Sequence, residues 1–395
     1  MLASADHVDV IAAGKAAGGM LRAVGDRPPR GLRRILGIGD GGPPAPLPAS
    51  TAWVTAGHPV PDARSVEAAV RALEIARSGG ERDALLVLLS GGGSALMALP
   101  APGLALADKQ RTVQALLVRG ADIHELNAVR KHISAIKGGR LAAATRARTI
   151  TLAISDVTGD DLSVIASGPT VPDASPFATA LEVLDRRGGR AGYPEPVVRH
   201  LQRGAAGREP ETPKAWDGCP PATAHVIGNL TTALDGASAG AAALGYEVHV
   251  IHRRLTGQAR VAGGALADAL AGVPRTGRRL CVIGGGETTV EVRGTGRGGR
   301  NQELALALAL RLEAIGGEVA ALSAGTDGVD GPTDAAGAIV DTSTVARARA
   351  TGMDPLGYLD NNDSYSFFAR LGDLVQTGPT GTNVGDIQIV LVGGW

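Results

Sequence analysis

The segment from Gly284 to Glu303 (GGGETTVEVRGTGRGGRNQE) combines residue types that bind phosphate groups in proteins. It contains seven glycines and the three arginines Arg293, Arg297 and Arg300, between an apolar run and a Leu/Ala-rich run. Glycine lets backbone N–H groups approach a ligand closely, a helix N-terminus carries the positive end of a dipole, and arginine binds anions in bidentate fashion. The segment therefore predicts an anion-binding loop for phosphate, with a glycine-rich hairpin and solvated arginines as the alternative.

Two further turns combine glycine with a lysine or a serine. Lys15 lies in Ala12–Met20 (AAGKAAGGM), and Ser94 follows the glycines of Leu89–Met97 (LSGGGSALM). Both turns follow apolar runs, and open α/β sheets bind their ligands at the carboxyl ends of such strands. The first turn lacks the spacing of a Walker A loop, so a surface lysine is an equal alternative. The second favours phosphate binding over a tight structural turn, because it offers N–H groups and a hydroxyl.

Carboxylates follow two other apolar runs. Asp156 opens one polar turn, and Asp327, Asp330 and Asp334 lie in Ala324–Ala338 (AGTDGVDGPTDAAGA). A carboxylate at a strand end suits Mg²⁺, which bridges phosphate oxygens and needs few protein ligands. An Asx turn or helix cap is an equal alternative for Asp156. The second loop lacks the closing glutamate of an EF-hand, so a base or a magnesium ligand is the better interpretation.

Short apolar runs and helical patterns alternate along the chain and must position these turns. Strands are predicted over Val8–Ala12, Ala52–Thr55, Leu85–Leu89, Thr149–Ile154, Ala224–Ile227, Glu247–Ile251, Leu280–Ile283, Thr288–Val292, Val319–Leu322 and Ile387–Val392. Helices are predicted over Ser65–Arg77, Asp108–Arg119, Asp122–Ile136 and Leu304–Leu312. Apolar strands that alternate with helices are typical of α/β proteins with mainly parallel sheets.

Two segments without a regular pattern bear on the domain boundary. Pro28–Pro48 is rich in Pro and Gly and is interpreted as a surface loop. Arg186–Pro221 has little apolar periodicity and is interpreted as an exposed crossing segment. A chain of 395 residues exceeds the usual size of a single core, so two domains are expected, over residues 1–220 and 221–395. A first domain that continues to about residue 270 is the alternative.

Composition restricts the classes of function. Acidic and basic residues balance at 39 each, which argues against a nucleic-acid or membrane-surface binder. Two cysteines cannot form a disulfide framework, and Cys281 lies in an apolar run where a core position is expected. No segment approaches the roughly 18 apolar residues of a membrane span. The sequence thus predicts a reduced, cytoplasmic protein.

Lysine is rare, since almost all basic residues are arginine. The chain has five lysines: Lys15, Lys109, Lys131, Lys137 and Lys214. In such a background a lysine is a candidate for a compact point charge, and Lys15, Lys131 and Lys137 lie in glycine-bearing or charged motifs. Arg130, Lys131 and His132 are consecutive and cannot share one helix face, so a solvated basic surface is expected there.

A nicotinamide site ranks second on the residues alone. The segment from Gly294 to Gly299 matches G-x-G-x-x-G, but this pattern is weak by itself. Glu318 begins the next predicted strand, whereas an acid that binds the ribose should close it. Two arginines within the loop also suit terminal phosphates better than a dinucleotide pyrophosphate.

The motifs together are more specific than any one of them. GKAAGGM, TAGHPVPD, LLSGGGSALM, NAVRKHISAIKGGRLA, SDVTGDDLSVIASGPT, GGETTV, GRGGRNQE, AGTDGVDG and TGPTGTN occur in this order. The chain resembles the glycerate 2-kinase family, the class II glycerate kinases with a C-terminal MOFRL domain, whose members have also been labelled hydroxypyruvate reductases. The resemblance extends from Ile11 to Val392. It implies a larger Rossmann-like domain with a mainly parallel sheet, a smaller α/β (MOFRL) domain, and an active site in the interdomain cleft.

The resemblance also implies an activity and its residues. Members phosphorylate D-glycerate at its 2-hydroxyl, using ATP and Mg²⁺, to give 2-phosphoglycerate and ADP in carbohydrate metabolism. Lys15 matches the lysine of GKAA, Arg300 the arginine of GRNQE and Asp327 the aspartate of GTDG, as catalytic residues. Nucleotide binding is expected from Ser90, Gly91, Gly92, Gly93 and Ser94. Asp327 as base or magnesium ligand stays open, with Asp156 as the second metal candidate.

Two other functions remain as alternatives. One is an NAD(P)H-dependent hydroxypyruvate reductase, which acts on the same small acid skeleton, and the other is a catalytically silent protein that binds small anions. The expected partner is a small molecule rather than a nucleic acid or a membrane, and a homodimer is compatible with the sequence. The resemblance also leads us to expect a helical segment ahead of the first strand, and the chain carries almost none of it.

Overall fold

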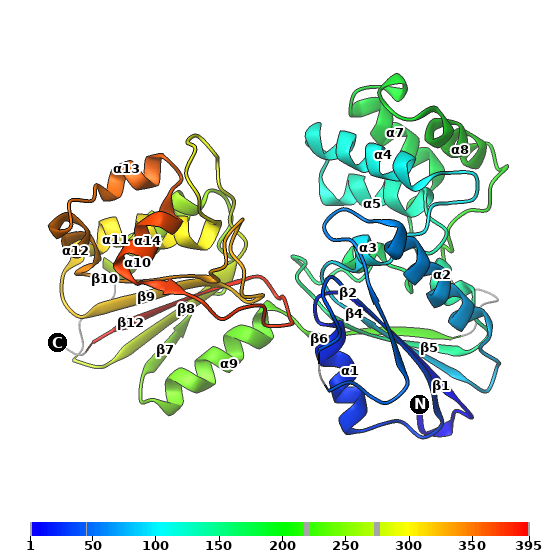
Figure 1. The fold of residues 1–395 in the computed structure, drawn as a ribbon, viewed down its shortest axis with the longest axis horizontal. Coiled ribbons are helices and arrows are strands. Elements are labelled where there is room, and N and C mark those ends of the chain that lie inside the picture. The colour runs from blue at the N-terminus through cyan, green and yellow to red at the C-terminus, as the bar shows by residue number, and fades with distance from the viewer. Residues whose placement is uncertain (1, 45, 217–220, 272–276, 394–395) are drawn as a thin grey trace. The chain divides into compact units, whose positions relative to one another are not determined.

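The chain divides into two compact units, Met1–Ile227 and Gly228–Trp395 (Figure 1). A computed structural model describes residues 2–44, 46–216, 221–271 and 277–393. The predicted domain boundary at residue 220 borders residues 217–220, which lie outside the described residues, and it stays a prediction. Each unit has its own sheet and its own buried cores, so the two are described separately.

The first unit alternates strands and helices as the sequence predicts. Its strands are β1 (Val8–Ala13), β2 (Leu32–Gly39), β3 (Thr51–Thr55), β4 (Ala84–Leu89), β5 (Arg148–Ile154) and β6 (Ala222–Gly228). Its helices are α1 (Ala17–Asp26), α2 (Ala63–Arg77), α3 (Gly93–Leu96), α4 (Leu106–Val118), α5 (Ile123–His132), α6 (Arg140–Ala143), α7 (Phe177–Arg186) and α8 (Glu195–Ala205). Short 3-10 turns cover Leu2–Ser4, Ile165–Ser167 and Arg190–Gly192.

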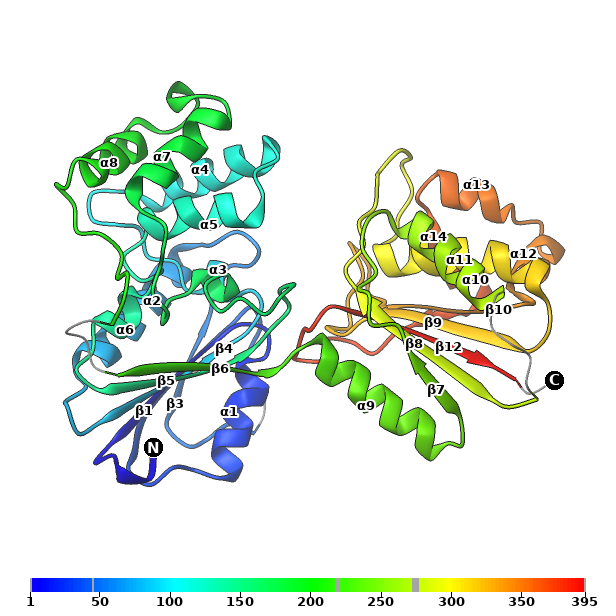
Figure 2. The ribbon, with the colours of Figure 1, turned by 180° about the vertical axis from the view of Figure 1, so that it is seen from behind.

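The sheet of the first unit has the order β3-β2-β1-β4-β5-β6. The pairs from β3 through β5 are parallel, which confirms the predicted Rossmann-like architecture. Chain order proceeds outward from β1 to β3 and then resumes at β4 on the other side of β1, so β1 and β4 form a topological switch point. Figures 1 and 2 show α1 on one face of the sheet, α2 and α3 on the other, and α4, α5, α7 and α8 as a further layer of helices.

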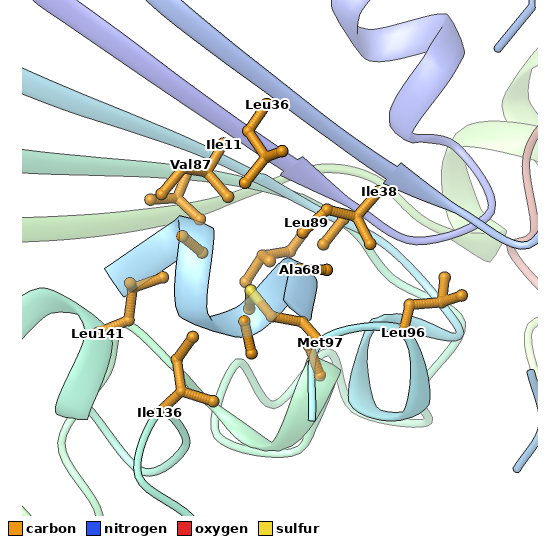
Figure 3. Close-up of a cluster of buried hydrophobic side chains, with 14 of the residues drawn as sticks. Ile11, Leu36, Ile38, Ala68, Val87, Leu89, Leu96, Met97, Ile136 and Leu141 are labelled. Atoms are coloured by element: carbon orange, nitrogen blue, oxygen red, sulfur yellow. The ribbon is translucent and has the colours of Figure 1, made fainter. Parts of the chain in front are cut away.

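The strands of this sheet are buried on both faces. Alternate side chains of β1, β2 and β4 meet α2 in one core, as Figure 3 shows for Ile11, Leu36, Val87 and Ala68. The residues between them pack with α1 in a second core on the opposite face. Burial on both faces explains why β4 appears in the sequence as a continuous apolar run and why β1 is apolar apart from Asp9.

The second unit is built on a mixed sheet. Its strands are β7 (Glu247–Val250), β8 (Leu280–Gly286), β9 (Val319–Gly325), β10 (Gly337–Asp341), β11 (Leu374–Val375) and β12 (Asp386–Val392), in the order β11-β10-β9-β12-β8-β7. Only β7 and β8 pair in parallel; the other pairs are antiparallel. The expectation of mainly parallel sheets is therefore wrong for this unit, since β12 returns from the end of the chain to lie between β8 and β9.

Helices cover both faces of the second sheet. They are α9 (Leu230–Ala243), α10 (Ala259–Ala271), α11 (Arg300–Ile315), α12 (Thr344–Ala350), α13 (Pro355–Asp360) and α14 (Ser364–Leu371). Figure 1 shows α9 on one face and α10 and α11 on the other. All residues of α11 from Asn301 to Ala309 are buried, because α10 and α12 to α14 surround it. The Leu/Ala alternation is thus a helix that is buried on all sides as far as Ala309, and the core position of Cys281 is confirmed.

Four local expectations need correction. Pro28–Pro48 contains β2 rather than only a surface loop, and Arg186–Pro221 contains α8, whose Val197 and Leu201 are buried. Thr288–Val292 forms no strand; Thr289 makes a single bridge to Gln258 after the chain leaves the sheet. The helix predicted over Asp122–Ile136 ends at His132. Within the described ranges, every helix is too short or too polar to span a bilayer.

The expected solvated basic surface at Arg130, Lys131 and His132 is also wrong. The Nζ atom of Lys131 lies 3.2 Å from Oδ1 of Asp173, and both residues are buried. His132 is fully buried, with Nδ1 2.7 Å from the carbonyl oxygen of Ala128 and Nε2 2.9 Å from Glu211. Burial lowers the pKa of His132, so the imidazole serves packing and hydrogen bonding in this helical layer.

Candidate functional site

The turns after β1 and β4 interlock at the switch point of the first unit. The hydroxyl of the buried Ser90 accepts a hydrogen bond of 2.9 Å from the Ala16 amide. The Lys15 amide donates to the carbonyl oxygen of Gly91 at 2.9 Å. Gly14 has a φ of +129°, and a Cβ there would overlap the Ser90 side chain, so only glycine allows this close approach. The two turns therefore hold Lys15 beside the glycines of the second motif.

Asp156 and His58 face the same turn. A Cβ on Gly91 would overlap the Asp156 carboxylate, and a Cβ on Gly92 would lie 3.2 Å from the His58 ring. Burial lowers the pKa of His58, the Lys15 charge lowers it further, and the carboxylates of Asp40 and Asp156 act in the opposite direction. The side chains of Lys15 and Asp156 thus each lie within electrostatic reach of His58 at the carboxyl edge of the sheet.

Ser94 is held by a buried lysine. Lys137 is 1% exposed, and its Nζ atom donates to the carbonyl oxygen of Ser94 at 2.8 Å, to its hydroxyl at 3.2 Å and to the carbonyl oxygen of Ala166 at 3.2 Å. The hydroxyls of Ser94 and Ser167 also lie 2.8 Å apart. These contacts fix the glycine turn from its far end, so the loop is rigid on both sides of Gly91–Gly93.

In the second unit, Arg300 is bound to a buried carboxylate. Its Nε and Nη2 atoms lie 2.6 and 2.9 Å from the two carboxylate oxygens of Asp386, which is 1% exposed. Its Nη1 atom lies 3.4 Å from Glu287. Although burial opposes it, the bidentate pair with Asp386 raises the pKa of Arg300. Arg300 is therefore a fixed cation at the start of α11, one third exposed.

The N-terminus of α11 is occupied by the chain's own Asp330. Its carboxylate accepts hydrogen bonds from the backbone N–H groups of Asn301 and Gln302 at 3.0 and 2.8 Å. Burial, the largest influence, raises the pKa of Asp330 to about 6, although these hydrogen bonds favour the charged form. The expectation that these amide groups hold a phosphate is therefore wrong, because an internal carboxylate already takes that place.

The glycines of Gly284–Glu303 also face the protein. A Cβ on Gly294, Gly296 or Gly298 would overlap atoms of the segment from Asn361 to Ser364. A Cβ on Gly299 would overlap Asp330.

The other two arginines of this segment are engaged as well. Arg293 pairs with Glu291 at 2.7 Å, and the Arg297 guanidinium lies 4.3 Å from the centre of the Tyr365 ring. Among the three loop arginines, Arg300 is thus the one that pairs with Asp386, the first residue of β12.

Asp327 lies on the same edge of the second sheet as Arg300. Its Oδ1 atom accepts a hydrogen bond of 3.1 Å from the Val329 amide, and the side chain is half-buried. A Cβ on Gly325 would lie 3.1 Å from Asp327 and 3.6 Å from Asp386, the partner of Arg300. Within each unit the predicted residues therefore converge: Lys15, Ser90–Ser94 and Asp156 in the first, and Arg300 and Asp327 in the second.

A magnesium ion fits the chemistry of these residues only with few protein ligands. The described residues contain no cluster of three or more His, Cys, Asp or Glu side chains that could hold a metal. Mg²⁺ in phosphoryl-transfer sites takes one or two carboxylates together with phosphate oxygens and water. Asp156 offers such a ligand, because Gly91 has no side chain and therefore leaves space for the Asp156 carboxylate.

Three residues of these clusters have no predicted role in the sequence. His58 lies in TAGHPVPD, Asp386 is the first residue of β12, and Lys109 lies in α4. The scarcity of lysine is a signal that could have identified Lys109. Asp386 could not be identified in this way, because its partner Arg300 is 86 residues away.

Comparisons with known proteins agree along the chain. Residues 1–202 match the family model of a domain of unknown function (DUF4147), and residues 280–386 match the model of the MOFRL family. The D-glycerate 2-kinase of Thermotoga maritima is 43% identical over 393 residues, which cover 98% of this chain and 91% of that protein. The glycerate 2-kinase of Pyrococcus horikoshii is 39% identical over 401 residues, covering 98% of this chain and 87% of that protein.

Two crystal structures resemble the fold. A glycerate kinase from Thermotoga maritima matches with a TM-score of 0.88 at 43% identity, over 98% of this chain and 92% of that one. A protein from Pyrococcus horikoshii matches with a TM-score of 0.83 at 38% identity, over 98% of this chain and 89% of that one. An Agrobacterium vitis protein, provisionally named a hydroxypyruvate reductase, is 44% identical over 348 residues, 86% of this chain and 88% of that protein.

Proposed function

The chain belongs to the glycerate 2-kinase family, and we propose that it transfers the terminal phosphoryl group of ATP to the 2-hydroxyl of D-glycerate. The products are 2-phosphoglycerate and ADP. The observation that carries the proposal is the position of Lys15, whose amide is hydrogen-bonded to Gly91 in the glycine turn of β4, while the Asp156 carboxylate borders the same glycine. A cation, a rigid glycine turn and a carboxylate at a switch point are what phosphoryl transfer requires of an α/β sheet.

The reaction needs little covalent chemistry from the protein. The 2-hydroxyl oxygen of glycerate forms a bond to the γ-phosphorus, the bond from that phosphorus to the bridging oxygen breaks, and ADP leaves. The hydroxyl proton passes to a carboxylate. Catalysis therefore depends on positioning and on stabilising the negative charge of the equatorial oxygens.

In the first unit, we assign Lys15 to neutralise the transferring phosphoryl group. The loop Gly91–Ser94 would approach the nucleotide with its backbone, and Ser90 supports it through the Ala16 amide. Asp156 would hold Mg²⁺, which would offset the negative charge of the phosphate groups. His58 is kept neutral by burial and by Lys15, so it adds no further positive charge near neutral pH.

In the second unit, Arg300 and Asp327 carry the proposal. The pair with Asp386 fixes the Arg300 guanidinium, and its Nη1 side would bind the glycerate carboxylate or a phosphate oxygen. Asp327 would accept the hydroxyl proton or bind magnesium. The variant Asp327→Asn separates these roles. If Asp327 is the base, the variant should lose kcat while its magnesium requirement stays unchanged. If Asp327 is a magnesium ligand, the variant should need more magnesium for its half-maximal rate.

We also propose the partner, the location and the oligomeric state of the enzyme. The substrate is a small molecule, and the balanced charge gives no support for nucleic acid as a partner. We further predict that the enzyme lies in the cytoplasm and uses ATP rather than another phosphoryl donor. An active site in an interdomain cleft and a homodimeric state are also predictions.

One assay tests the function directly. The protein is incubated with D-glycerate and either ATP–Mg²⁺ or NAD(P)⁺, and both ADP and reduced nicotinamide are measured. We expect ADP and 2-phosphoglycerate in equal amounts, only when magnesium is present. Reduced nicotinamide without ADP would instead support the hydroxypyruvate reductase alternative. Binding of D-glycerate without either product would leave a small-anion binding protein.

A further inference from the structure

A pocket of about 890 Å³ opens in the first unit beside the glycine turn of β4. Gly92, Ser94 and His58 line one end of it, and α4 forms a long wall. Its volume lies in the range of about 300–1,000 Å³ that is typical of pockets for cofactor-sized ligands. The pocket therefore adjoins the cluster around Lys15, because His58 belongs to both.

Five cationic residues line this pocket, and three of them form one group: Lys109 from α4, Arg130 from α5 and Lys137 from the turn after α5. The other two are Arg111, which pairs with Asp108 at 2.7 Å, and Arg119. Lys109 is 3% exposed and Lys137 is 1% exposed. The Nζ atom of Lys109 has one hydrogen bond, of 3.3 Å, to the carbonyl oxygen of Arg130. Across the described residues, the Arg130 guanidinium forms no ion pair or side-chain hydrogen bond, which leaves its fork of donors available to a ligand.

No carboxylate in the described part of the chain pairs with this group of three. The charges that act on Lys137 are those of Lys109 and Arg130, and both are positive. Together with burial, which is the larger influence, they lower the pKa of Lys137, while burial and Arg130 lower the pKa of Lys109 to about 7. Buried charges in folded proteins are normally paired, so an uncompensated cationic group facing a pocket indicates an anionic ligand.

Apolar side chains also line the pocket. They come from the turn Pro59–Pro61 and from Val113, Leu117 and Val118 of α4. Val118 is 76% exposed and Leu117 is 49% exposed, so this apolar surface is available to a ligand. A ligand with both a polyanionic end and a flat apolar end would satisfy the whole pocket.

We propose that this pocket binds the nucleoside polyphosphate, with Lys109 and Arg130 on its phosphates and the base against Pro59–Pro61 and Val118. The proposal rests on the kinase function proposed above and names where the donor binds. Lys137 acts through Ser94, whose carbonyl oxygen and hydroxyl it holds, and so positions the glycine turn. The phosphate chain would then extend from the cationic group past Gly92 toward Lys15. D-glycerate is too small to span this length.

The test measures ADP binding, which needs no turnover. Titration calorimetry of ADP is performed with the wild-type protein, Lys109→Met and Arg130→Gln, and with Lys214→Met as the matched control. Lys214 is a partly exposed lysine of the same unit, outside the pocket. We expect ADP affinity to fall by about 10-fold to 100-fold in both pocket variants, as for loss of a charge-assisted hydrogen bond, and to stay at the wild-type value in the control.

Two further measurements separate a ligand contact from a structural role. Adenosine, which lacks phosphates, should bind the wild-type protein and both variants equally. In steady-state assays the KM for ATP should rise in the variants, whereas the KM for D-glycerate stays within about twofold. Lys109→Arg keeps the charge and should recover part of the ADP affinity.

Other outcomes overturn the proposal. Unchanged ADP affinity in both pocket variants would show that the nucleotide phosphates do not bind in this pocket. A rise in the KM for D-glycerate alone would show that the cations bind the acceptor, D-glycerate, instead. Failure of this inference is distinguishable from failure of the proposed function. A wild-type protein that phosphorylates D-glycerate while the variants bind ADP normally retains the function and loses this site. A wild-type protein that binds ADP through Lys109 but forms no 2-phosphoglycerate retains this site and loses the function.

Discussion

Two glycine-rich turns of this chain look alike in the sequence and differ in the structure. Both Leu89–Met97 and Gly284–Glu303 follow an apolar strand and precede a helix. The turn after β4 borders a pocket in which Lys109, Arg130 and Lys137 have no carboxylate partner within the described ranges. The segment after β8 is filled by the protein itself: Asp330 binds the first amide groups of α11, Asp386 binds Arg300, and Asn361–Ser364 covers the glycines.

The difference shows what a glycine pattern can establish. A glycine indicates that some atom approaches the backbone closely, but it does not distinguish a ligand from another part of the chain. The counter-charges make that distinction. Where buried carboxylates neutralise the donors, the segment is structural; where buried cations lack partners, the segment faces a ligand. The catalytic roles that we propose in the second unit are those of Arg300 and Asp327, at the margin of this segment.

Lys15→Ala should have the largest effect and should act on catalysis alone. Loss of a positioned charge on the transferring group is expected to lower kcat/KM by about 100-fold to 1,000-fold. The midpoint of thermal unfolding should change little, because Lys15 is half-buried and the hydrogen bond from its backbone amide to Gly91 does not need the side chain. The measurement is steady-state ADP formation, with Lys214→Ala as control. A loss of only a few-fold would remove Lys15 from the transition state.

Asp330→Ala should have the next largest effect, on stability. Removal of the carboxylate leaves the buried N–H groups of Asn301 and Gln302 without their acceptor. Each buried donor left unsatisfied costs about 1–3 kcal/mol, so the free energy of unfolding should fall by about 2–4 kcal/mol. Denaturant unfolding followed by circular dichroism measures it. Asp334→Ala is the control, because that carboxylate lies on the surface and bonds Tyr365 and Gln376. An unchanged midpoint for Asp330→Ala would contradict the structural assignment of this segment.

The fold could be predicted where burial leaves a local signal. β4 is buried on both faces and therefore appears as an uninterrupted apolar run, and the equally buried β1 is interrupted only by Asp9. β2 was not predictable in this way, because Arg33 and Arg34 interrupt it and Pro and Gly flank it. The structure explains both arginines: each donates two hydrogen bonds to the buried Asp9 of the neighbouring strand. A strand whose charges are compensated by a neighbouring strand therefore has a sequence typical of a loop.

The site could be predicted only in part for a related reason. Lys15, Ser94, Asp156 and Asp327 follow strands directly, so strand position and residue type identify them. Whether a charge is compensated depends on distant partners, and this separates Arg300, bound to Asp386, from the cations of the pocket. The sequence contains both charges of a pair but does not contain their distance.

Gly91→Ala offers a smaller and more selective test of the same contrast. The added methyl group would overlap the Asp156 carboxylate and displace it from the glycine turn. A displacement of about 1 Å in a catalytic group can cost up to about 100-fold in rate, so we expect kcat to fall at least about tenfold.

Gly299→Ala is the counterpart in the second unit. Its methyl group would overlap Asp330, and we expect it to lower stability first. Gly42→Ala, where no atom lies within 4 Å of the new methyl group, is the common control. If Gly91→Ala unfolds the protein and Gly299→Ala only slows the enzyme, the turn after β4 would be the structural one and the segment after β8 the catalytic one.

Lys109→Met should raise stability slightly, in a manner that depends on pH. The pKa of Lys109 is about 7 in the folded chain and 10.5 as the ordinary value, so folding disfavours its charged form. Below about pH 7 the lysine is charged in both states and the folded state bears the full penalty. As pH rises toward about 10, the folded state loses its proton first and the penalty disappears. The titratable groups that share the pocket are His58, Arg111, Arg119, Arg130 and Lys137.

The gain in the thermal midpoint on replacing Lys109 should therefore be largest below pH 7 and shrink through the alkaline range. It should amount to about 2–4 °C for each kcal/mol of relief. Differential scanning calorimetry without nucleotide measures it across this range, with Lys214→Met as the control. A gain of equal size at every pH would mean that the methionine merely packs better than lysine. A loss of stability at neutral pH would mean that the cation is compensated within the chain, as Arg300 is, and the two turns would then no longer differ.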